Sequence, residues 1–295
     1  MMQPRILELR TSILKKNDAL ARQLRVQFAR RGLLVVNVVS APGSGKTELL
    51  TRTLTLLNGG GPSGPVSSFA PRMSSFAPRM SSFAPRKQRL VADAAVTDDA
   101  TFAERKATIF AERKATTLAE RRVTYRTAAI VGDLATENDA QRLATSGSPT
   151  KQILTGTMCH LEADMVAGAL ADWNLSDFDF LFIENVGNLV CPSSWDLGED
   201  LRVLLCAVTE GEDKPLKYPT LINSADVVVV SKLDLAAAIE FDLALLLQNI
   251  ERVRPGVPVF QLSAKTGEGL DEWCHDLTER LEQKRTLNPD PFPVS

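Results

Sequence analysis

The chain has 295 residues, of which 44% are hydrophobic and 24% are charged, and its formal net charge is −2. Such a composition is typical of a globular chain with one large or two small domains, and it excludes collagen, a coiled coil and a fully disordered chain. Its four cysteines are too few and too irregularly spaced for a disulfide framework, which indicates a reducing compartment. The start of the chain lacks the apolar core of a signal peptide, and no run of about 18 apolar residues occurs. We therefore expect a cytoplasmic protein that is neither exported nor embedded in a membrane.

The first expected elements are a helix, a strand and a second helix. Residues 1–32 form a predicted amphipathic helix, because its apolar residues recur at spacings of three, four and seven. These residues are Ile6, Leu9, Ile13, Leu20, Leu24 and Phe28. The β-branched run from Leu33 to Ser40 predicts a strand buried on both faces. The segment Lys46 to Leu57 predicts the helix that follows it.

Residues 59–122 are expected to be a low-complexity insertion that is disordered. The heptad SSFAPRM or SSFAPRK occurs three times from Ser67, and an eight-residue unit of the type FAERKAT repeats from Phe102. Proline in the first repeat excludes a helix, and a period of eight does not keep one helical face. From Ser67 to Arg126 the chain carries twelve Lys or Arg against six Asp or Glu, so a basic docking arm is the alternative interpretation.

The rest of the chain alternates strands and helices, which predicts an α/β fold with a doubly wound, mostly parallel sheet flanked by helices. The domain would comprise residues 33–58 and 123–285, with a tail at 286–295. Ligands in such folds bind at the carboxyl ends of the strands. The further predicted strands are Ala128–Asp133, Lys151–Thr155, Phe178–Asn185, Leu201–Val208, Asp226–Lys232 and Val257–Ala264.

The segment SAPGSGKT, Ser40 to Thr47, has the form of a P-loop directly after a strand and before a helix. Its glycines let backbone N–H groups surround a phosphate, its lysine meets the β and γ oxygens, and its threonine hydroxyl binds Mg²⁺. Ser40 stands where the usual pattern has its first glycine. The predicted nucleotide-binding residues here are Gly43, Ser44, Gly45, Lys46, Thr47 and Glu48.

Two later loops favour GTP over ATP. In VVVVSKLDL, Asp234 can accept both N1–H and the amino group of guanine, while Lys232 packs over the purine; a plain helix N-cap is the alternative. Ser231 replaces the usual asparagine. The second loop, SAKTGEGL, resembles the other base-contacting loop of GTPases and supplies Ser263, Ala264 and Lys265.

Two strand ends finish in carboxylates. Asp133 and Glu184 could hold Mg²⁺ or orient the attacking water, so together with Lys46 they are the predicted catalytic residues. Gly187 of ENVG occupies the place of a switch glycine that donates its N–H to the γ-phosphate. A simple turn is the alternative for this tetrapeptide.

Three residues could hold a transition metal. Cys159 and His160 adjoin in the sequence, and Cys191 lies within the predicted switch; two thiolates and an imidazole suit Zn²⁺ or Ni²⁺. Two chains meeting face to face could complete such a site. The alternative is that both cysteines are small buried hydrophobes. Cys206 and the pair Cys274 and His275 are expected to be core and surface residues.

Taken together, these loops resemble the HypB family, the nickel-incorporation GTPases of nickel–iron hydrogenase maturation. The resemblance rests on SAPGSGKTELL, GDLATENDAQRL, TGTMCHLEADMV, FLFIENVGNLVCP, VTEGEDKPLKYP and VVSKLDL, in family order. It implies a homodimeric GTPase that passes Ni²⁺ to a HypA-type nickel accessory protein and so to the hydrogenase large subunit precursor. It also implies that Cys159, His160 and Cys191 are the metal site of the GTPase domain.

Some members of the family carry an N-terminal Cys-x-x-Cys-Gly-Cys nickel site, and others carry a histidine-rich tract. This chain has only two histidines, and its first cysteine is Cys159, so nickel storage is not expected. The alternatives are a urease-type nickel GTPase, a P-loop small-molecule kinase, and a scaffold whose basic repeats bind nucleic acid or membrane. We expect neither nucleic acid nor a membrane as a partner. In the expected mechanism, GTP draws Gly187 toward the γ-phosphate and this movement carries Cys191 into or out of metal-binding geometry. Hydrolysis should be slow without a partner, because no matching loop supplies an arginine finger.

Overall fold

The computed structural model describes residues 4–60, 123–133 and 138–287. For residues 4–11 it describes the helix but not the side chains. All but the first two residues of the predicted insertion, 59–122, lie outside the described residues, and so do residues 288–295 of the predicted tail. The account below concerns the described residues, which all belong to one compact unit.

Seven strands form one parallel sheet with the order β3-β2-β4-β1-β5-β6-β7, so the predicted fold class is confirmed. All six neighbouring pairs are parallel. The central strands β1 and β4 consist of valine, leucine, isoleucine and phenylalanine, except for Asn37 and Glu184, because both of their faces are covered. The strands are β1 Leu34–Val39, β2 Thr127–Asp133, β3 Thr150–Leu154, β4 Phe180–Glu184, β5 Leu201–Ala207, β6 Val227–Ser231 and β7 Val259–Gln261.

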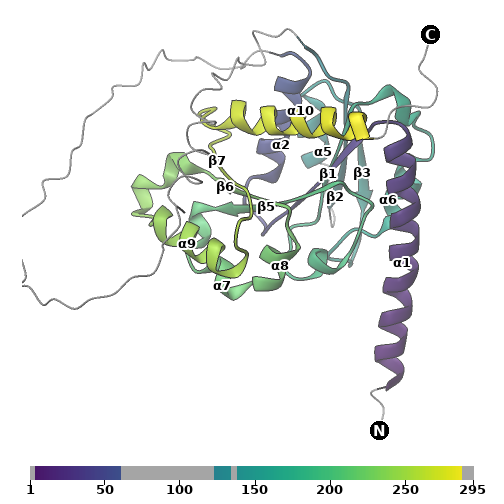
Figure 1. Ribbon diagram of the computed structural model, residues 1–295, viewed down its shortest axis with the longest axis horizontal. Helices are drawn as coiled ribbons and strands as arrows, with labels where there is room; N and C mark the ends of the chain where they lie inside the picture. Colours follow the sequence, from purple (N-terminus) through teal and green to yellow (C-terminus); the bar gives the residue numbers. More distant parts are fainter. Residues whose placement is uncertain (1–3, 61–122, 134–137, 288–295) are drawn as a thin grey trace, which may run out of the picture. The chain divides into compact units, whose positions relative to one another are not determined.

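Helices cover both faces of this sheet. The α-helices are α1 Pro4–Arg30, α2 Lys46–Leu57, α5 Asn138–Ala144, α6 Ala163–Leu170, α7 Lys214–Lys217, α8 Pro219–Ser224, α9 Leu243–Val253 and α10 Leu270–Leu287. Short 3-10 helices are η1 Leu175–Asp177, η2 Cys191–Ser194, η3 Val208–Glu210, η4 Leu233–Leu235 and η5 Ala237–Ile239. Figure 1 shows α2 and α10 on one side of the strands and α8 and α9 on the other.

The alternation of side chains along β1 sorts the core into clusters. Val36 and Val38 pack with α2 and α10, whereas Val35 packs with α1 and α6. Val39 points to the same face as Val35 because successive strand residues alternate, but it packs with α8 and α9. Two apolar clusters therefore lie side by side on one face of the sheet.

The prediction for the first helix was wrong at Ile13, whose side chain is 52% exposed. The apolar residues of α1 that are buried in the core, Ala21, Leu24 and Phe28, lie in its second half. Periodicity identified the helix but not the length of its contact with the sheet. Ile6 and Leu9 lie among the residues whose side chains are not described.

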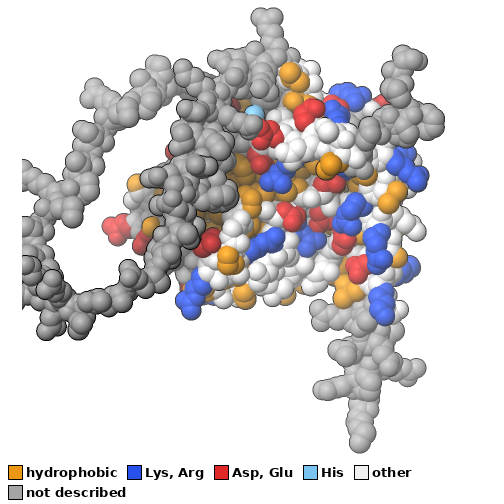
Figure 2. All heavy atoms as spheres, in the orientation of Figure 1, with side chains coloured by type: hydrophobic (Ala, Val, Ile, Leu, Met, Phe, Trp, Pro, Cys, Tyr) orange, Lys and Arg blue, Asp and Glu red, His pale blue; other side chains and the backbone are white. Residues whose placement is uncertain are grey.

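None of the described helices is long and apolar enough to cross a membrane. Figure 2 shows basic and acidic side chains interspersed over the described part of one face.

The last helix is tied to the first strand by a largely buried charge. Lys284 Nζ donates to the carbonyl of Leu33 at 2.7 Å and pairs with Asp200 Oδ2 at 2.6 Å. The same carboxylate oxygen accepts from the backbone N–H of Val35 at 2.8 Å. Burial lowers the pKa of Lys284, and Asp200 opposes this shift. The Asp200 carboxylate thus provides a partner for two groups that folding removes from water, the Lys284 ammonium and the Val35 N–H.

Replacing Asp200 by alanine should leave the Lys284 ammonium without its carboxylate and the Val35 N–H without an acceptor. We expect the free energy of unfolding, measured by urea denaturation, to fall by about 3 kcal/mol. Lys217→Ala, which breaks an exposed pair with Asp213, is the control and should leave the transition almost unchanged. Equal midpoints for the two variants would contradict this account.

Candidate functional site

The loop between β1 and α2 has the backbone of a phosphate cradle. Gly43 and Gly45 have φ values of +75° and +95°, which residues with a Cβ rarely adopt. Lys46 Nζ lies 3.2 Å from Ser40 Oγ, so the serine that replaces the usual glycine contacts the phosphate-binding lysine. Burial lowers the pKa of Lys46, while the attraction of Glu184 raises it. The ammonium therefore lies in a largely desolvated site, where it would attract a phosphate strongly.

A carboxylate from β4 meets the end of this loop. Thr47 Oγ1 donates to Glu184 Oε1 at 2.9 Å, and Glu184 Oε2 is buried without a hydrogen-bond partner. Burial raises the pKa of Glu184 to about 7, although Lys46 and the Thr47 hydrogen bond lower it. A buried oxygen that lacks a partner beside a hydroxyl is a donor set that fits Mg²⁺.

Asp133 lies at the same edge of the sheet. Asp133 is the last residue of β2, which pairs with β4. Two residues earlier in β2, Val131 stands opposite Glu184 of β4. The structure thus places both predicted carboxylates at the carboxyl ends of adjacent strands. The segment that follows Asp133, residues 134–137, lies outside the described residues.

The two predicted base-contacting loops touch each other. Ser263 Oγ donates to Asp234 Oδ1 at 2.7 Å, and Lys265 Nζ lies 3.8 Å from Asp234 Oδ2. Ala264 lies between these two residues in the same loop. One oxygen of Asp234 is therefore oriented by a hydroxyl while the carboxylate remains beside a cation.

Both base-contacting loops are also connected to the phosphate loop through the end of β6. Lys232, which has a φ of +61°, donates from Nζ to the carbonyl of Gly43 at 2.7 Å. Ser231 Oγ donates to the carbonyl of Ser44 at 3.0 Å. The serine that replaces the usual asparagine thus contacts the phosphate loop.

The predicted residue Glu48 has other partners. Its carboxylate pairs with Arg142 at 3.1 Å and with Arg52 at 3.6 Å. Gly187, by contrast, packs on the phosphate loop, since a Cβ added to it would lie 3.0 Å from Pro42 Cα. A larger residue here would require the loop at Pro42 to shift by a few tenths of an ångström.

Sequence reasoning assigned no role to Glu210, which also contacts the phosphate loop, or to its partner Lys214. Glu210 accepts from the Ser44 hydroxyl and forms an ion pair with Lys214. Lys214 Nζ donates in addition to the carbonyl of Leu205 at 3.0 Å. These contacts connect the phosphate loop to the segment that leads into α7 and α8.

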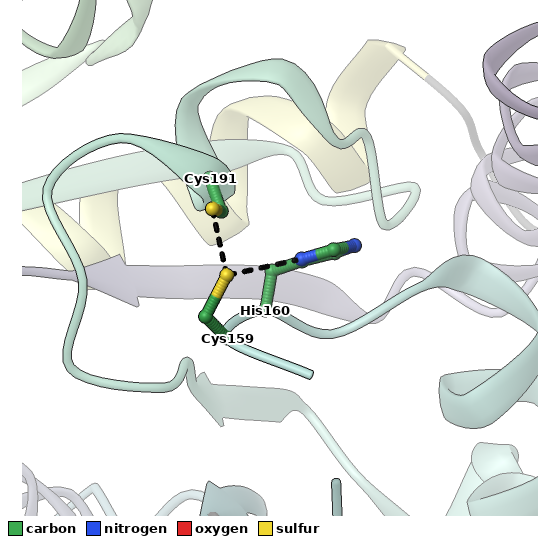
Figure 3. Close-up of side chains that lie close together, drawn as sticks. All are labelled: Cys159, His160 and Cys191. Carbon is green, nitrogen blue, oxygen red and sulfur yellow. Dashed lines mark hydrogen bonds between the residues drawn. The ribbon is translucent and has the colours of Figure 1, made fainter. Parts of the chain in front are cut away.

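The three residues predicted to hold a transition metal lie together (Figure 3). Their ligand atoms are all within 4.8 Å of one another. Cys159 Sγ lies 2.7 Å from Cys191 Sγ and 3.9 Å from His160 Nδ1. Cys159 and His160 come from the loop between β3 and α6, and Cys191 begins η2. Two sulfurs and one imidazole nitrogen form a donor set that suits Zn²⁺ or Ni²⁺.

Cys206 is a core residue, as predicted, whereas Cys274, which was expected on the surface with His275, is also fully buried because it lies on the face of α10 that packs against the sheet. Burial raises the pKa of Cys206 to about 11 and that of Cys274 to about 12, so both remain neutral thiols. His275, next to Cys274, is partly exposed and lies 3.3 Å from Glu279.

Two residues that the sequence did not identify orient the imidazole of His160. Trp195 stacks on it with ring centroids 4.3 Å apart and an interplanar angle of 26°. His160 Nε2 makes no hydrogen bond, and Glu162 Oε1 lies 3.5 Å away. A carboxylate behind the second ring nitrogen is the usual support of a metal-binding histidine. The spacing Cys-His-Leu-Glu could have indicated Glu162, whereas Trp195 carried no local signal.

A groove of about 540 Å³ adjoins this cluster. Its lining includes His160, Cys191 and Trp195, together with Tyr218 and Leu221. The metal-binding candidates are therefore next to an accessible, largely apolar surface formed by the segment that follows Glu210.

Comparison with protein families identifies the domain. The model of the CobW/HypB/UreG nucleotide-binding domain matches residues 114–261. This range contains the metal cluster, Glu184 and Asp234, whereas the phosphate loop precedes it.

Curated relatives match over most of the chain. Hydrogenase maturation factor HypB of Azotobacter vinelandii is 37% identical over 271 residues, covering 92% of this chain and 68% of the relative. The protein of the same name from Escherichia coli K12 is 37% identical over 275 residues, covering 93% and 73%. Hydrogenase/urease maturation factor HypB of Helicobacter pylori is 32% identical and covers 92% of this chain and 86% of the relative.

Solved structures agree with these relatives. HypB from Helicobacter pylori in complex with nickel superimposes with a TM-score of 0.64 at 31% identity, covering 95% of this chain and all of that one. Hydrogenase maturation factor HypB from Archaeoglobus fulgidus gives a TM-score of 0.63 at 28% identity, covering 90% and 99%. On this sequence similarity, over nine-tenths of its length, the chain belongs to the HypB family of hydrogenase maturation factors.

Proposed function

We propose that the protein is a GTP-hydrolysing nickel metallochaperone that binds Ni²⁺ and delivers it during maturation of a nickel–iron hydrogenase. One observation carries the proposal: Cys191 of the metal cluster lies seven residues after Glu184, on the segment that leaves the nucleotide site. The name of the relatives, and the nickel bound to the Helicobacter pylori protein, support the choice of cargo.

For hydrolysis, Lys46 and the N–H groups of the glycine loop would bind the β- and γ-phosphates. Thr47 and Glu184 would hold Mg²⁺, with Asp133 beside them, and the ion would supply positive charge next to the phosphates. Gly187, packed on Pro42, would donate its N–H to the γ-phosphate.

For nucleotide choice, Asp234 would accept the two donors on the edge of guanine. Ser263 orients one of its oxygens, and the other lies 3.8 Å from Lys265 Nζ. The stem of Lys232 crosses the phosphate loop at Gly43, where it could cover one face of the purine. Adenine lacks the matching donors, so this arrangement favours GTP.

For nickel, Cys159, His160 and Cys191 would supply three ligands, which leaves a position for a ligand from elsewhere. A second copy of the chain that approached along the apolar groove could supply it, so we propose a homodimer with the metal at its interface. Zn²⁺ would fit the same donors. A HypA-type nickel accessory protein and the hydrogenase large subunit precursor are the proposed acceptors of the metal.

Nucleotide and metal binding would be coupled, because both act on the segment from Glu184 to Cys191. If GTP changes the affinity for Ni²⁺ by some factor, Ni²⁺ must change the affinity for GTP by the same factor. Hydrolysis would then reset the metal site after delivery.

Lys46→Ala should abolish phosphate binding by the loop and lower GTP turnover by about a hundredfold or more, because it removes a preorganised cation from the transition state. The measurement is phosphate release with excess Mg²⁺ and GTP. Arg280→Ala, which breaks a pair within α10, is the control and should keep full turnover. Surviving turnover in Lys46→Ala would show that the phosphate site had been assigned to the wrong loop.

Cys191→Ala should lower the amount of nickel bound per chain while GTP turnover remains measurable, because it removes one thiolate and leaves the nucleotide loops intact. Anaerobic equilibrium dialysis against Ni²⁺ gives the stoichiometry. Cys206→Ala is the matched control, since its thiol is buried in β5 and neutral. If both variants bound as much nickel as the wild type, the cluster would not be the nickel site.

A further inference from the structure

A buried polar residue interrupts the apolar face of β1. Asn37 lies on the same face as Val35 and Val39, between the two clusters that these valines join, and its side chain is fully buried. Its amide donates from Nδ2 to Glu199 Oε1 at 3.1 Å and accepts at Oδ1 from Asn185 Nδ2 at 3.3 Å. An apolar residue at this position would avoid the free-energy cost of removing an amide from water. The asparagine therefore indicates that its hydrogen bonds have a role of their own.

On one side, Asn37 is connected to the segment that leaves the nucleotide site. Its partner Asn185, also fully buried, directly follows Glu184. Asn185 Oδ1 accepts from the backbone N–H of Val186 at 2.9 Å and from that of Leu161 at 3.2 Å. Leu161 is the neighbour of His160, so one amide side chain holds both the start of the switch segment and the loop that carries two of the proposed metal ligands.

On the other side, Asn37 is connected to the segment after Cys191. Glu199 Oε1 accepts from Arg202 Nη2 at 2.6 Å and from Arg202 Nε at 2.8 Å. The same guanidinium donates to the carbonyl of Ser193 at 3.1 Å and to that of Trp195 at 2.7 Å. Because Trp195 stacks on His160, this side of the network also ends at the proposed metal site.

These contacts form a ring that runs from Asn185 through Asn37 and Glu199 to Arg202. At one end it holds the loop of His160 through Leu161, and at the other it holds Trp195, which stacks on His160. Asn37 lies within β1, and Glu199 lies just before β5. A displacement of Val186 would break its bond to Asn185 unless the amide followed. A buried polar group that loses its hydrogen-bond partner destabilises the structure considerably. The amide of Asn185 would therefore move with Val186, and its hydrogen bonds to Leu161 and Asn37 would be disturbed.

We propose that Asn37 is a positioning residue that couples the nucleotide state to the geometry of the metal cluster. The inference rests on the proposed function, because it specifies how the nickel site of that function is regulated. In this proposal, a change of the bound nucleotide moves the segment from Val186 to Trp195. The ring from Asn185 to Arg202 then moves with it and displaces the loop that carries His160. Asn37 touches neither nucleotide nor metal.

The test compares Ni²⁺ affinity in two nucleotide states. Wild-type protein is titrated with Ni²⁺ anaerobically, once with GDP and once with a non-hydrolysable GTP analogue, and the ratio of the two dissociation constants is the coupling. We expect a ratio of at least about fivefold in the wild type. Asn37→Val, which fits a buried strand but removes both hydrogen bonds, should bring the ratio to within about twofold of one. Its affinity for the GTP analogue should stay within about threefold of the wild-type value.

Asn249→Leu is the matched control. Asn249 is also a buried asparagine, but it lies in α9, and its amide donates to the carbonyl of Glu212 outside the network. A general loss of stability would affect the control as well as Asn37→Val, whereas a loss of coupling would affect only the latter. The ratio of affinities, and not the affinity alone, therefore separates positioning from mere structural support.

Arg202→Lys provides a second variant should Asn37→Val fail to fold. It keeps a cation beside Glu199 but cannot donate to Ser193 and Trp195 from one planar group. We expect the same loss of coupling. A wild-type ratio near one would overturn the proposed function itself. A wild-type ratio above fivefold that persists in the folded variant would overturn only the role of the network.

Discussion

The register between β1 and β4 is the constraint on which the rest of the site depends. Val38 stands opposite Glu184, and the backbone N–H of Asn185 donates to the carbonyl of Val38 at 3.0 Å. This pairing fixes the carboxylate of β4 beside the threonine that opens α2. A shift by one residue would turn the carboxylate to the other face of the sheet and separate it from Thr47.

Because all strands are parallel, their carboxyl ends gather the loops that the chain distributes over most of its length. The phosphate loop receives Lys232 and Ser231 from β6 and Glu210 from the segment after β5. The metal cluster lies on the continuation of β4 and on the loop after β3. The proposed nucleotide and metal sites are thus neighbours along one segment, and this proximity is the physical basis of the coupling that we propose.

The interior beneath this edge is not uniformly apolar. Charged and amide side chains such as Asn37, Asn185 and Glu199 are buried, and each has hydrogen-bond partners. Such a network has few alternative arrangements, because each displaced group would lose a partner in a region of low dielectric. It can therefore hold the loops above it in defined positions, which a purely apolar core would do less specifically.

Sequence alone determined the features with local signals. The observed helix α2, Lys46–Leu57, has the predicted bounds, since glycine and proline before it and the apolar period within it are encoded in adjacent residues. All seven strands were also predicted, the first from a buried β-branched run and the others from short apolar runs. Periodicity failed at Ile13, because it cannot reveal where the sheet beneath a helix ends. Only the tertiary structure placed Cys159 against Cys191, 32 residues apart, and Asn37 against Glu199, 162 residues apart. Trp195 and Asn37 gained their roles through such long-range contacts, which are decided by packing and register and not by neighbouring residues in the chain.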